Sequence, residues 1–124
     1  MPAYNEALNI METVRQWYPV VERLSKRGVD AKLIIANDGS KDDTFAIMQG
    51  LKPMYPLFVP LNKSNSGHGA TLLYLYRHAV SCGADYIFQT DSDGQTSPDE
   101  FWQMWENRDV FDFQIGYRKE RQES

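Results

Sequence analysis

The 124-residue sequence has a single cysteine, no long apolar run and fewer basic than acidic residues. The lone Cys82 cannot form an intrachain disulfide, which fits a reducing compartment, and we expect it to pack within a helix. No stretch approaches the roughly 18 apolar residues of a membrane span, and no signal-peptide pattern precedes the first motif. The net charge of −4 argues against a nucleic-acid binder dominated by phosphate contacts. We therefore expect a cytoplasmic protein, and attachment of a longer parent protein to the cytoplasmic face of a membrane stays open.

The chain length and its 42% hydrophobic content fit one globular domain with one core. Short apolar runs or alternating patterns predict strands at 31–37, 57–61, 86–88 and 111–115. Helical periodicity predicts helices from a cap at Asn5 to Gly28, from a cap at Ser40 with Asp43 as its capping-box acid, over 68–82, and from Pro98 onward. Alternating helices and strands predict an α/β fold with a mainly parallel sheet flanked by helices.

A pair of carboxylates follows the apolar run at 86–88. Asp91 and Asp93 are two residues apart, so both side chains point the same way from an extended chain, and Gln95 adds a neutral oxygen at the next position. Hard oxygen ligands of this kind suit Mg²⁺ or Mn²⁺ with a phosphate completing the shell. A simple Asp- and Gly-rich turn is the structural alternative. An EF-hand does not fit, because Gly94 is fourth and Trp102 twelfth in the loop. A haloacid-dehalogenase-type phosphatase would carry its motif after the first strand, not the fourth.

Polar clusters follow each predicted strand, and parallel strands bring such clusters to one sheet edge. One contains Tyr4, which either stacks on a base or packs. Another contains Asp38, which either accepts a hydrogen bond from a base or ribose or serves a turn at the helix start. The third contains Gly67-His68-Gly69, whose backbone N–H groups could approach a phosphate, although the segment lacks the Lys-Ser/Thr of a P-loop.

Four segments in series resemble family 2 glycosyltransferases. They are Pro2-Ala3-Tyr4-Asn5-Glu6, Asn37-Asp38-Gly39-Ser40-Lys41-Asp42-Asp43-Thr44, Asn65-Ser66-Gly67-His68-Gly69-Ala70 and Asp91-Ser92-Asp93-Gly94-Gln95. Gln95, with Gly116-Tyr117-Arg118 and Arg121, resembles the branch of dolichyl-phosphate mannose synthases and polyprenyl-phosphate glycosyltransferases.

This resemblance implies a Rossmann-like GT-A fold and inverting transfer of a sugar from a nucleotide-diphosphate sugar, GDP- or UDP-linked, to a polyprenyl phosphate. It implies that the nucleoside is held by Pro2, Tyr4, Glu6 and Asp38, with Asp91 also at the nucleotide. It implies that Asp91, Asp93 and Gln95 face Mg²⁺ or Mn²⁺ and the diphosphate. Asp93 and Arg118 are the expected catalytic residues, with Arg118 meeting the acceptor phosphate.

The sequence departs from the family pattern at both ends. Most of the family's first strand would precede Pro2, and its acceptor-binding half would follow Arg121. We therefore expect a shortened form that keeps the nucleotide site in one domain, 1–124, and that forms a dimer or exchanges a strand. A non-catalytic nucleotide-binding module and a sugar-phosphate nucleotidyltransferase remain alternatives, although the latter would carry a Gly-rich loop where Pro2-Ala3-Tyr4-Asn5-Glu6 stands.

Overall fold

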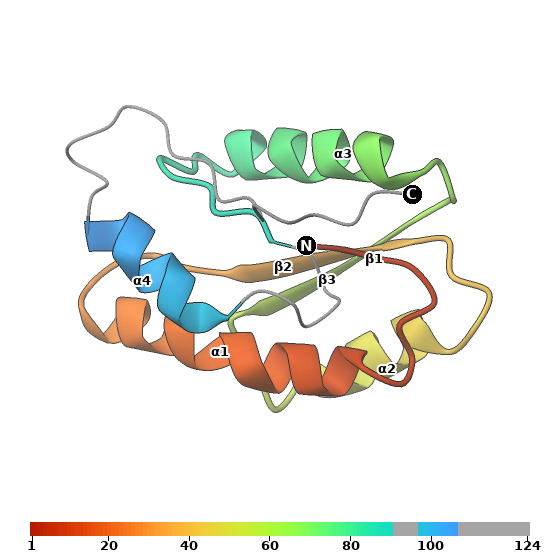
Figure 1. Ribbon diagram of the computed structural model, residues 1–124, viewed down its shortest axis with the longest axis horizontal. Helices are drawn as coiled ribbons and strands as arrows, with labels where there is room; N and C mark the ends of the chain where they lie inside the picture. The colour runs from red at the N-terminus through yellow and green to blue at the C-terminus, as the bar shows by residue number, and fades with distance from the viewer. Residues whose placement is uncertain (91–96, 107–124) are drawn as a thin grey trace.

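The computed structural model describes residues 1–90 and 97–106. Within these ranges strands and helices alternate over most of the chain, as predicted (Figure 1). In chain order they are β1 (Pro2–Ala3), α1 (Ile10–Lys26), β2 (Leu33–Asp38), α2 (Thr44–Leu51), β3 (Phe58–Lys63), α3 (His68–Ser81) and α4 (Pro98–Glu106). The predicted strand at 111–115 lies outside the described residues.

The described strands form one parallel sheet in the order β1-β2-β3. β2 pairs along its whole length with β3, from Leu33 opposite Phe58 to Asp38 opposite Lys63. β1 pairs only Pro2 with Ala36 and Ala3 with Asn37, and the Met1 ammonium extends this contact by donating to the Ile34 carbonyl at 2.8 Å. The mainly parallel α/β sheet predicted from the sequence is confirmed.

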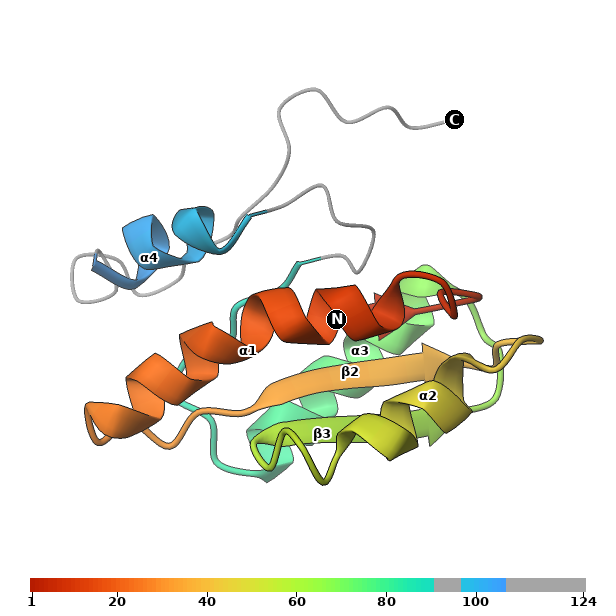
Figure 2. The same ribbon diagram turned by 90° about the horizontal axis from the view of Figure 1, so that it is seen from below.

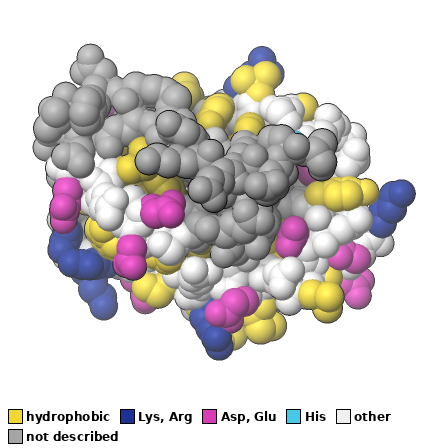
Figure 3. Space-filling model, in the orientation of Figure 1, with side chains coloured by type: hydrophobic (Ala, Val, Ile, Leu, Met, Phe, Trp, Pro, Cys, Tyr) yellow, Lys and Arg dark blue, Asp and Glu magenta, His cyan; other side chains and the backbone are white. Residues whose placement is uncertain are grey.

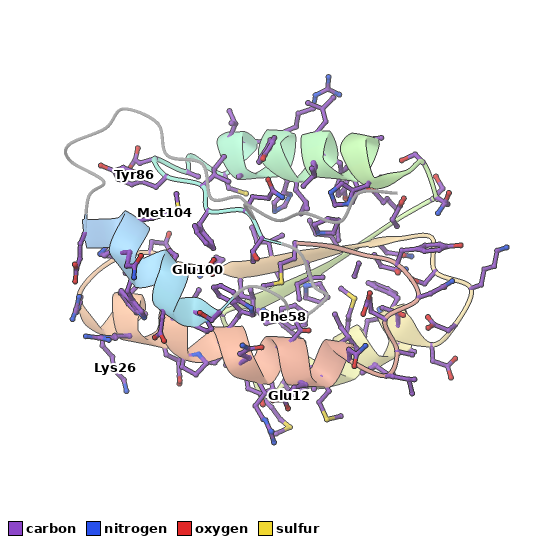
Figure 4. All side chains as sticks on the ribbon, viewed as in Figure 1. Glu12, Lys26, Phe58, Tyr86, Glu100 and Met104 are labelled. Carbon is purple, nitrogen blue, oxygen red and sulfur yellow. The ribbon has the colours of Figure 1, made fainter. Side chains whose placement is uncertain are left out.

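Helices cover both faces of the sheet. α3 lies on one face against β1 and β2, and α1 and α2 lie on the other, as the two views show (Figure 1 and Figure 2). The core between the sheet and α1–α2 is apolar and fully closed around Ile10, Val14, Ile35, Met48 and Phe58, each completely buried. Phe58 points into this layer, whereas Glu12 and Lys26 lie on the outer side of α1 (Figure 4). Burial of such side chains is the main source of stability for the sheet.

The starts of the first two helices differ from the prediction. Helix α1 begins at Ile10 after Asn9, not after Asn5, because Asn5 adopts a left-handed turn with φ +52°. Leu8, expected on the apolar face, precedes the helix and is 97% exposed. Helix α2 begins at Thr44 after Asp43, and Ser40 does not cap it. Asn5 and Ser40 instead bond to each other's loops, which is described below.

The segment 84–90 is not the buried strand predicted around residues 86–88. It makes no ladder in the sheet, and Tyr86 and Ile87 are 53% and 41% exposed. The physical reason is that β1, at the edge of the described sheet, offers two paired residues, and one of them is proline, which has no N–H to donate. The segment still returns from the end of α3 toward the N-terminus (Figure 1).

Two further sequence expectations concern α3. The helix ends near the predicted Gly83, whose φ of +81° and the hydrogen bond from Ala84 N–H to the Ala79 carbonyl make a left-handed helix end. Cys82, expected to pack, is exposed, and its Sγ lies 3.7 Å from His78 Nε2.

Among the described residues no helix is long and apolar enough to cross a membrane.

Lys, Arg, Asp and Glu side chains lie around the rim of the face shown in Figure 3, with several basic side chains together at the lower left. Two basic residues, Arg23 in α1 and Arg27 at its end, lie over the Trp102 ring, 4.5 and 5.7 Å from its centroid.

Candidate functional site

The candidate site is the edge of the sheet where β1, β2 and β3 end. The register places Ala3, Asn37 and Asn62 in one row, so the loops that follow the three strands start side by side. All three loops lie at the same end of the molecule as the start of α3 (Figure 1 and Figure 2). Asn37 Nδ2 donates to Asn62 Oδ1 at 2.9 Å and ties the ends of β2 and β3 together. The predicted convergence of polar segments is present for these three.

The loop after β1 is fastened to the loop after β2 by hydrogen bonds in both directions. Asn5 N–H donates to Ser40 Oγ at 2.9 Å, and Lys41 N–H donates to Asn5 Oδ1 at 2.8 Å. Ser40 Oγ in turn donates to Asn37 Oδ1. These bonds explain the left-handed conformation of Asn5, because its backbone and its side chain both face the same neighbouring loop.

A second group of bonds fastens the next two residues of the same loop. Glu6 N–H donates to Thr44 Oγ1 at 2.9 Å, and Ala7 N–H donates to Asp42 Oδ2 at 3.2 Å. The other Asp42 oxygen accepts from the Thr44 N–H at 3.0 Å and from the Thr44 hydroxyl. Thr44 is fully buried. The Thr44 hydroxyl bond, more than any other influence, lowers the pKa of Asp42, so its carboxylate is charged at neutral pH.

Asp38, at the end of β2, is the buried carboxylate of the site. Its side chain is 6% exposed and accepts from Lys63 Nζ at 3.1 Å, Ser66 N–H at 2.9 Å and Gly67 N–H at 3.1 Å. Burial is the largest single influence and raises the pKa of Asp38, but the bonds from Ser66 and Lys63, with others, outweigh it and the net shift is downward. Asp38 thereby holds the loop that leads into α3.

The loops after β2 and β3 touch at Gly39. A Cβ on Gly39 would lie 2.4 Å from the Asn65 backbone nitrogen, and Gly39 has φ +61°. Asn65 Nδ2 also donates to the Asp38 carbonyl at 2.9 Å. Glycine is therefore required at position 39 both by the turn and by the close approach of the second loop.

Helix α3 begins where these loops meet. Gly67, its N-cap residue, has φ +96° and ψ 165°, a conformation open mainly to glycine. Its carbonyl accepts from Thr71 N–H at 3.1 Å and from the Thr71 hydroxyl at 2.9 Å. Gly67 N–H donates to Asp38 and is therefore not available to an anion at this helix start.

The chain approaches the acidic motif through residues held by side chains. Phe88 packs against Trp17 of α1 and Phe101 of α4, with ring centroids 5.9 and 5.1 Å away. Gln89 Oε1 accepts from Tyr76 of α3 at 3.0 Å, on the other face of the sheet. Thr90 is 7% exposed, and its hydroxyl has no hydrogen-bond partner within the described structure.

The predicted site residues fall into two groups. The structure brings Pro2, Tyr4, Glu6 and Asp38 to the candidate edge: Pro2 is buried in β1, Tyr4 is 42% exposed, and Glu6 is half-buried. The other predicted residues, Asp91, Asp93, Gln95 and Arg118, lie outside the described residues. In the described part of the chain no three His, Cys, Asp or Glu side chains gather as a metal site.

Sequence reasoning missed four residues that organise this edge. Lys63, Asn65, Asp42 and Thr44 all bond to residues distant in the sequence, up to 38 positions away. The parallel register could have located Lys63, since it lies directly opposite Asp38. No feature of the sequence predicts the contacts of Asp42 with Ala7 or of Thr44 with Glu6, because these contacts depend on how two loops meet in the fold.

Comparison with known proteins gives a consistent match. The profile of Glycosyl transferase family 2 matches residues 1–115, nearly the whole chain. The chain is 31% identical over 107 residues to a dolichyl-phosphate beta-glucosyltransferase of Trichomonas vaginalis, covering 84% of this chain and 31% of that protein. It is 30% identical over 113 residues to a UDP-N-acetylglucosamine–dolichyl-phosphate N-acetylglucosaminyltransferase of Methanococcus voltae, covering 81% of this chain and 42% of that protein.

A third relative has a different lipid carrier in its name. It is an undecaprenyl-phosphate 4-deoxy-4-formamido-L-arabinose transferase of Pseudomonas syringae, 26% identical over 102 residues, with 81% of this chain and 28% of that protein covered. The chain thus spans between about a quarter and two fifths of the length of these curated relatives.

Proposed function

This chain belongs to Glycosyl transferase family 2, and we propose that it is the nucleotide-sugar-binding part of an inverting glycosyltransferase with a GT-A fold. The donor is a GDP- or UDP-linked sugar and the acceptor is a polyprenyl phosphate at the cytoplasmic face of a membrane. The names of three relatives, which contain dolichyl or undecaprenyl phosphate, support this acceptor class.

The observation that carries the proposal is the meeting of three loops at one sheet edge in a family 2 chain. Open parallel sheets bind ligands outside the carboxyl ends of their strands. Tyr4, which is 42% exposed, offers a ring for stacking on a base, beside Pro2 and Glu6. Asp38 offers a carboxylate to the base or ribose, and a nucleoside donor must compete with Lys63 Nζ for Asp38 Oδ1.

The diphosphate belongs next to Asp91, Asp93 and Gln95. Two carboxylates and an amide oxygen are the hard donors that Mg²⁺ or Mn²⁺ prefers, so the residue types fit the metal. Thr90, directly before them, is buried with its hydroxyl unpartnered in the described structure, so a polar group lies at the start of the motif. The bound metal supplies a Lewis acid that stabilises the departing nucleoside diphosphate.

A polyprenyl-phosphate acceptor needs the protein mainly to orient its phosphate toward the sugar. A phosphate oxygen of a polyprenyl phosphate is already anionic near neutral pH, so it does not require a strong general base. Arg118 would meet the acceptor phosphate, since a guanidinium binds phosphate through two parallel hydrogen bonds. Asp93 would face the departing diphosphate and its metal, while the sugar passes to the acceptor phosphate oxygen.

Calorimetric titration of the chain with GDP and with UDP, each with and without Mn²⁺, tests the proposal. We expect binding of one nucleotide that strengthens with Mn²⁺ and is lost in Asp91→Asn and Asp93→Asn. Asp99→Asn, an exposed carboxylate in the first turn of α4, serves as the control. No binding of either nucleotide would refute the proposal, and binding that is indifferent to Mn²⁺ and to both motif variants would refute the metal site.

A further inference from the structure

The first loop of the site, residues 4–7, is held in place by the loop at 40–44, to which the proposed function assigns no role. Four of its hydrogen bonds run to the loop at 40–44, and no regular secondary structure spans residues 4–6. Asn5, in the middle of the loop, is the only described non-glycine residue with a positive φ. A conformation of this kind persists only where surrounding contacts determine it.

Asp42 and Thr44 supply the two bonds closest to the start of α1. One Asp42 oxygen accepts from Ala7 N–H while the other accepts from Thr44, and the Thr44 hydroxyl accepts from Glu6 N–H. Asp42 and Thr44 each accept a hydrogen bond from the loop at 4–7, and they are also hydrogen-bonded to each other. The Glu6 carbonyl then accepts from Asn9 and Ile10 N–H at 2.9 and 2.8 Å, so the same residue anchors the first turn leading into α1.

We propose that Asp42 and Thr44 are positioning residues that hold the Tyr4–Glu6 turn in the conformation that binds the nucleoside. The inference rests on the proposed function, because it concerns the affinity of that same site. Neither residue needs to touch the ligand. Asp42 and Thr44 fix two consecutive backbone N–H groups, and this sets the direction in which the half-exposed Tyr4 ring and the Glu6 side chain leave the chain.

Asp42→Asn and Thr44→Val test the proposal with matched controls. Asparagine has one acceptor oxygen, so it can serve Thr44 or Ala7 but not both. Asp43→Asn removes the same charge from the adjacent residue, whose side chain makes no capping hydrogen bond. Thr44→Val removes only the hydroxyl from a fully buried side chain, and Thr44→Ser keeps it.

Two measurements are made on each variant: the affinity for GDP and UDP with Mn²⁺, and amide hydrogen exchange by NMR. We expect Asp42→Asn and Thr44→Val to weaken nucleotide binding about tenfold, the effect of one hydrogen bond to a charged or buried group. The Glu6 and Ala7 amides should exchange faster while those of Leu33, which donates to the Leu57 carbonyl, and Ile35 in β2 stay protected. Asp43→Asn and Thr44→Ser should match the wild type in both respects.

Unchanged nucleotide affinity in Asp42→Asn and Thr44→Val would overturn the positioning role. An equal loss in Asp43→Asn would also overturn it, because the effect would then be one of general charge. Faster exchange throughout the sheet would assign Asp42 and Thr44 to global stability instead. If the wild type binds neither nucleotide, the proposed function fails first, and this outcome is distinguishable because it appears before any substitution is made.

Discussion

Replacing Gly39 by alanine tests whether the two loops meet as closely as the structure shows. The substitution has two separable costs. Alanine in a left-handed conformation, at φ +61°, costs about 1–2 kcal/mol. The added Cβ would also lie 2.4 Å from the Asn65 backbone nitrogen, so the loop after β3 must move.

The second cost arises because the loop after β3 carries the hydrogen bonds to Asp38. Movement of Asn65 pulls on the bonds from Ser66 N–H, Gly67 N–H and Asn65 Nδ2 to Asp38. Losing one hydrogen bond to a charged group costs about 1.5–3 kcal/mol. We therefore expect Gly39→Ala to lower the free energy of unfolding by about 2.5–5 kcal/mol, the sum of strain and one broken bond.

Two other glycines provide the controls for a urea denaturation series followed by circular dichroism. Gly28 has φ +86° with nothing within 4 Å of its Cβ position, so Gly28→Ala reports the strain alone. Gly50 lies in α2 without a positive φ and with open space around it, so Gly50→Ala should raise stability by up to about 1 kcal/mol. With an m-value of about 2 kcal/mol/M, the midpoint of Gly39→Ala should lie about 1 M below that of Gly28→Ala. Equal midpoints for Gly39→Ala and Gly28→Ala would refute the close contact of the loops.

Three further predictions concern other parts of the chain. Asp38→Asn should lower stability at pH 7 by about 2–4 kcal/mol, because Lys63 and two backbone N–H groups lose a charged acceptor. Folding lowers the pKa of Asp38, so the contribution of Asp38 to the free energy of unfolding is complete above the unfolded pKa and is lost as the pH falls through the folded pKa. An unfolding curve that Asp38→Asn leaves unchanged at pH 7 would contradict this prediction. Pro19→Ala should stabilise the protein by about 1–3 kcal/mol, because Pro19 is exposed within α1 and alanine restores a helical N–H donor; a lower urea midpoint would count against this. The two-residue β1 and the exposed Tyr86 and Ile87 favour a dimer or strand exchange. Light scattering after size-exclusion chromatography measures the mass, and a monomeric mass at all concentrations would exclude this prediction.

The parts of the fold that sequence reasoning located well are those set by local periodicity. The runs at 31–37 and 57–61 became β2 and β3 with shifts of one or two residues, because both strands pair along their whole length. Pro98 begins α4 as expected of a proline at the first helical position, and Gly83 ends α3. Alternation of these elements was enough to predict the parallel sheet and the edge at which the loops meet.

The parts that failed depend on long-range partners. Asn5 and Ser40 are good helix caps by residue type, but each finds its hydrogen-bond partner in the opposite loop, about 35 positions away. The run at 86–88 has the composition of a strand, yet a strand also needs a neighbouring backbone to bond with, and β1 is too short to provide it. Residue type states what a side chain can bind, whereas the tertiary fold decides which partner is present.

The way residues 84–90 are held decides whether this segment can open independently of the sheet. The amides through which β2 and β3 pair are held by a continuous ladder, so their exchange with solvent requires opening of the sheet. Residues 84–90 depend instead on ring contacts of Phe88 with Trp17 and Phe101, on the contact of Tyr86 with Trp105, and on one exposed bond from Tyr76 to Gln89. Withdrawal of these rings would release the segment while the sheet stays closed. Residues 84–90 can therefore open as a local unit that is less stable than the ladder between β2 and β3.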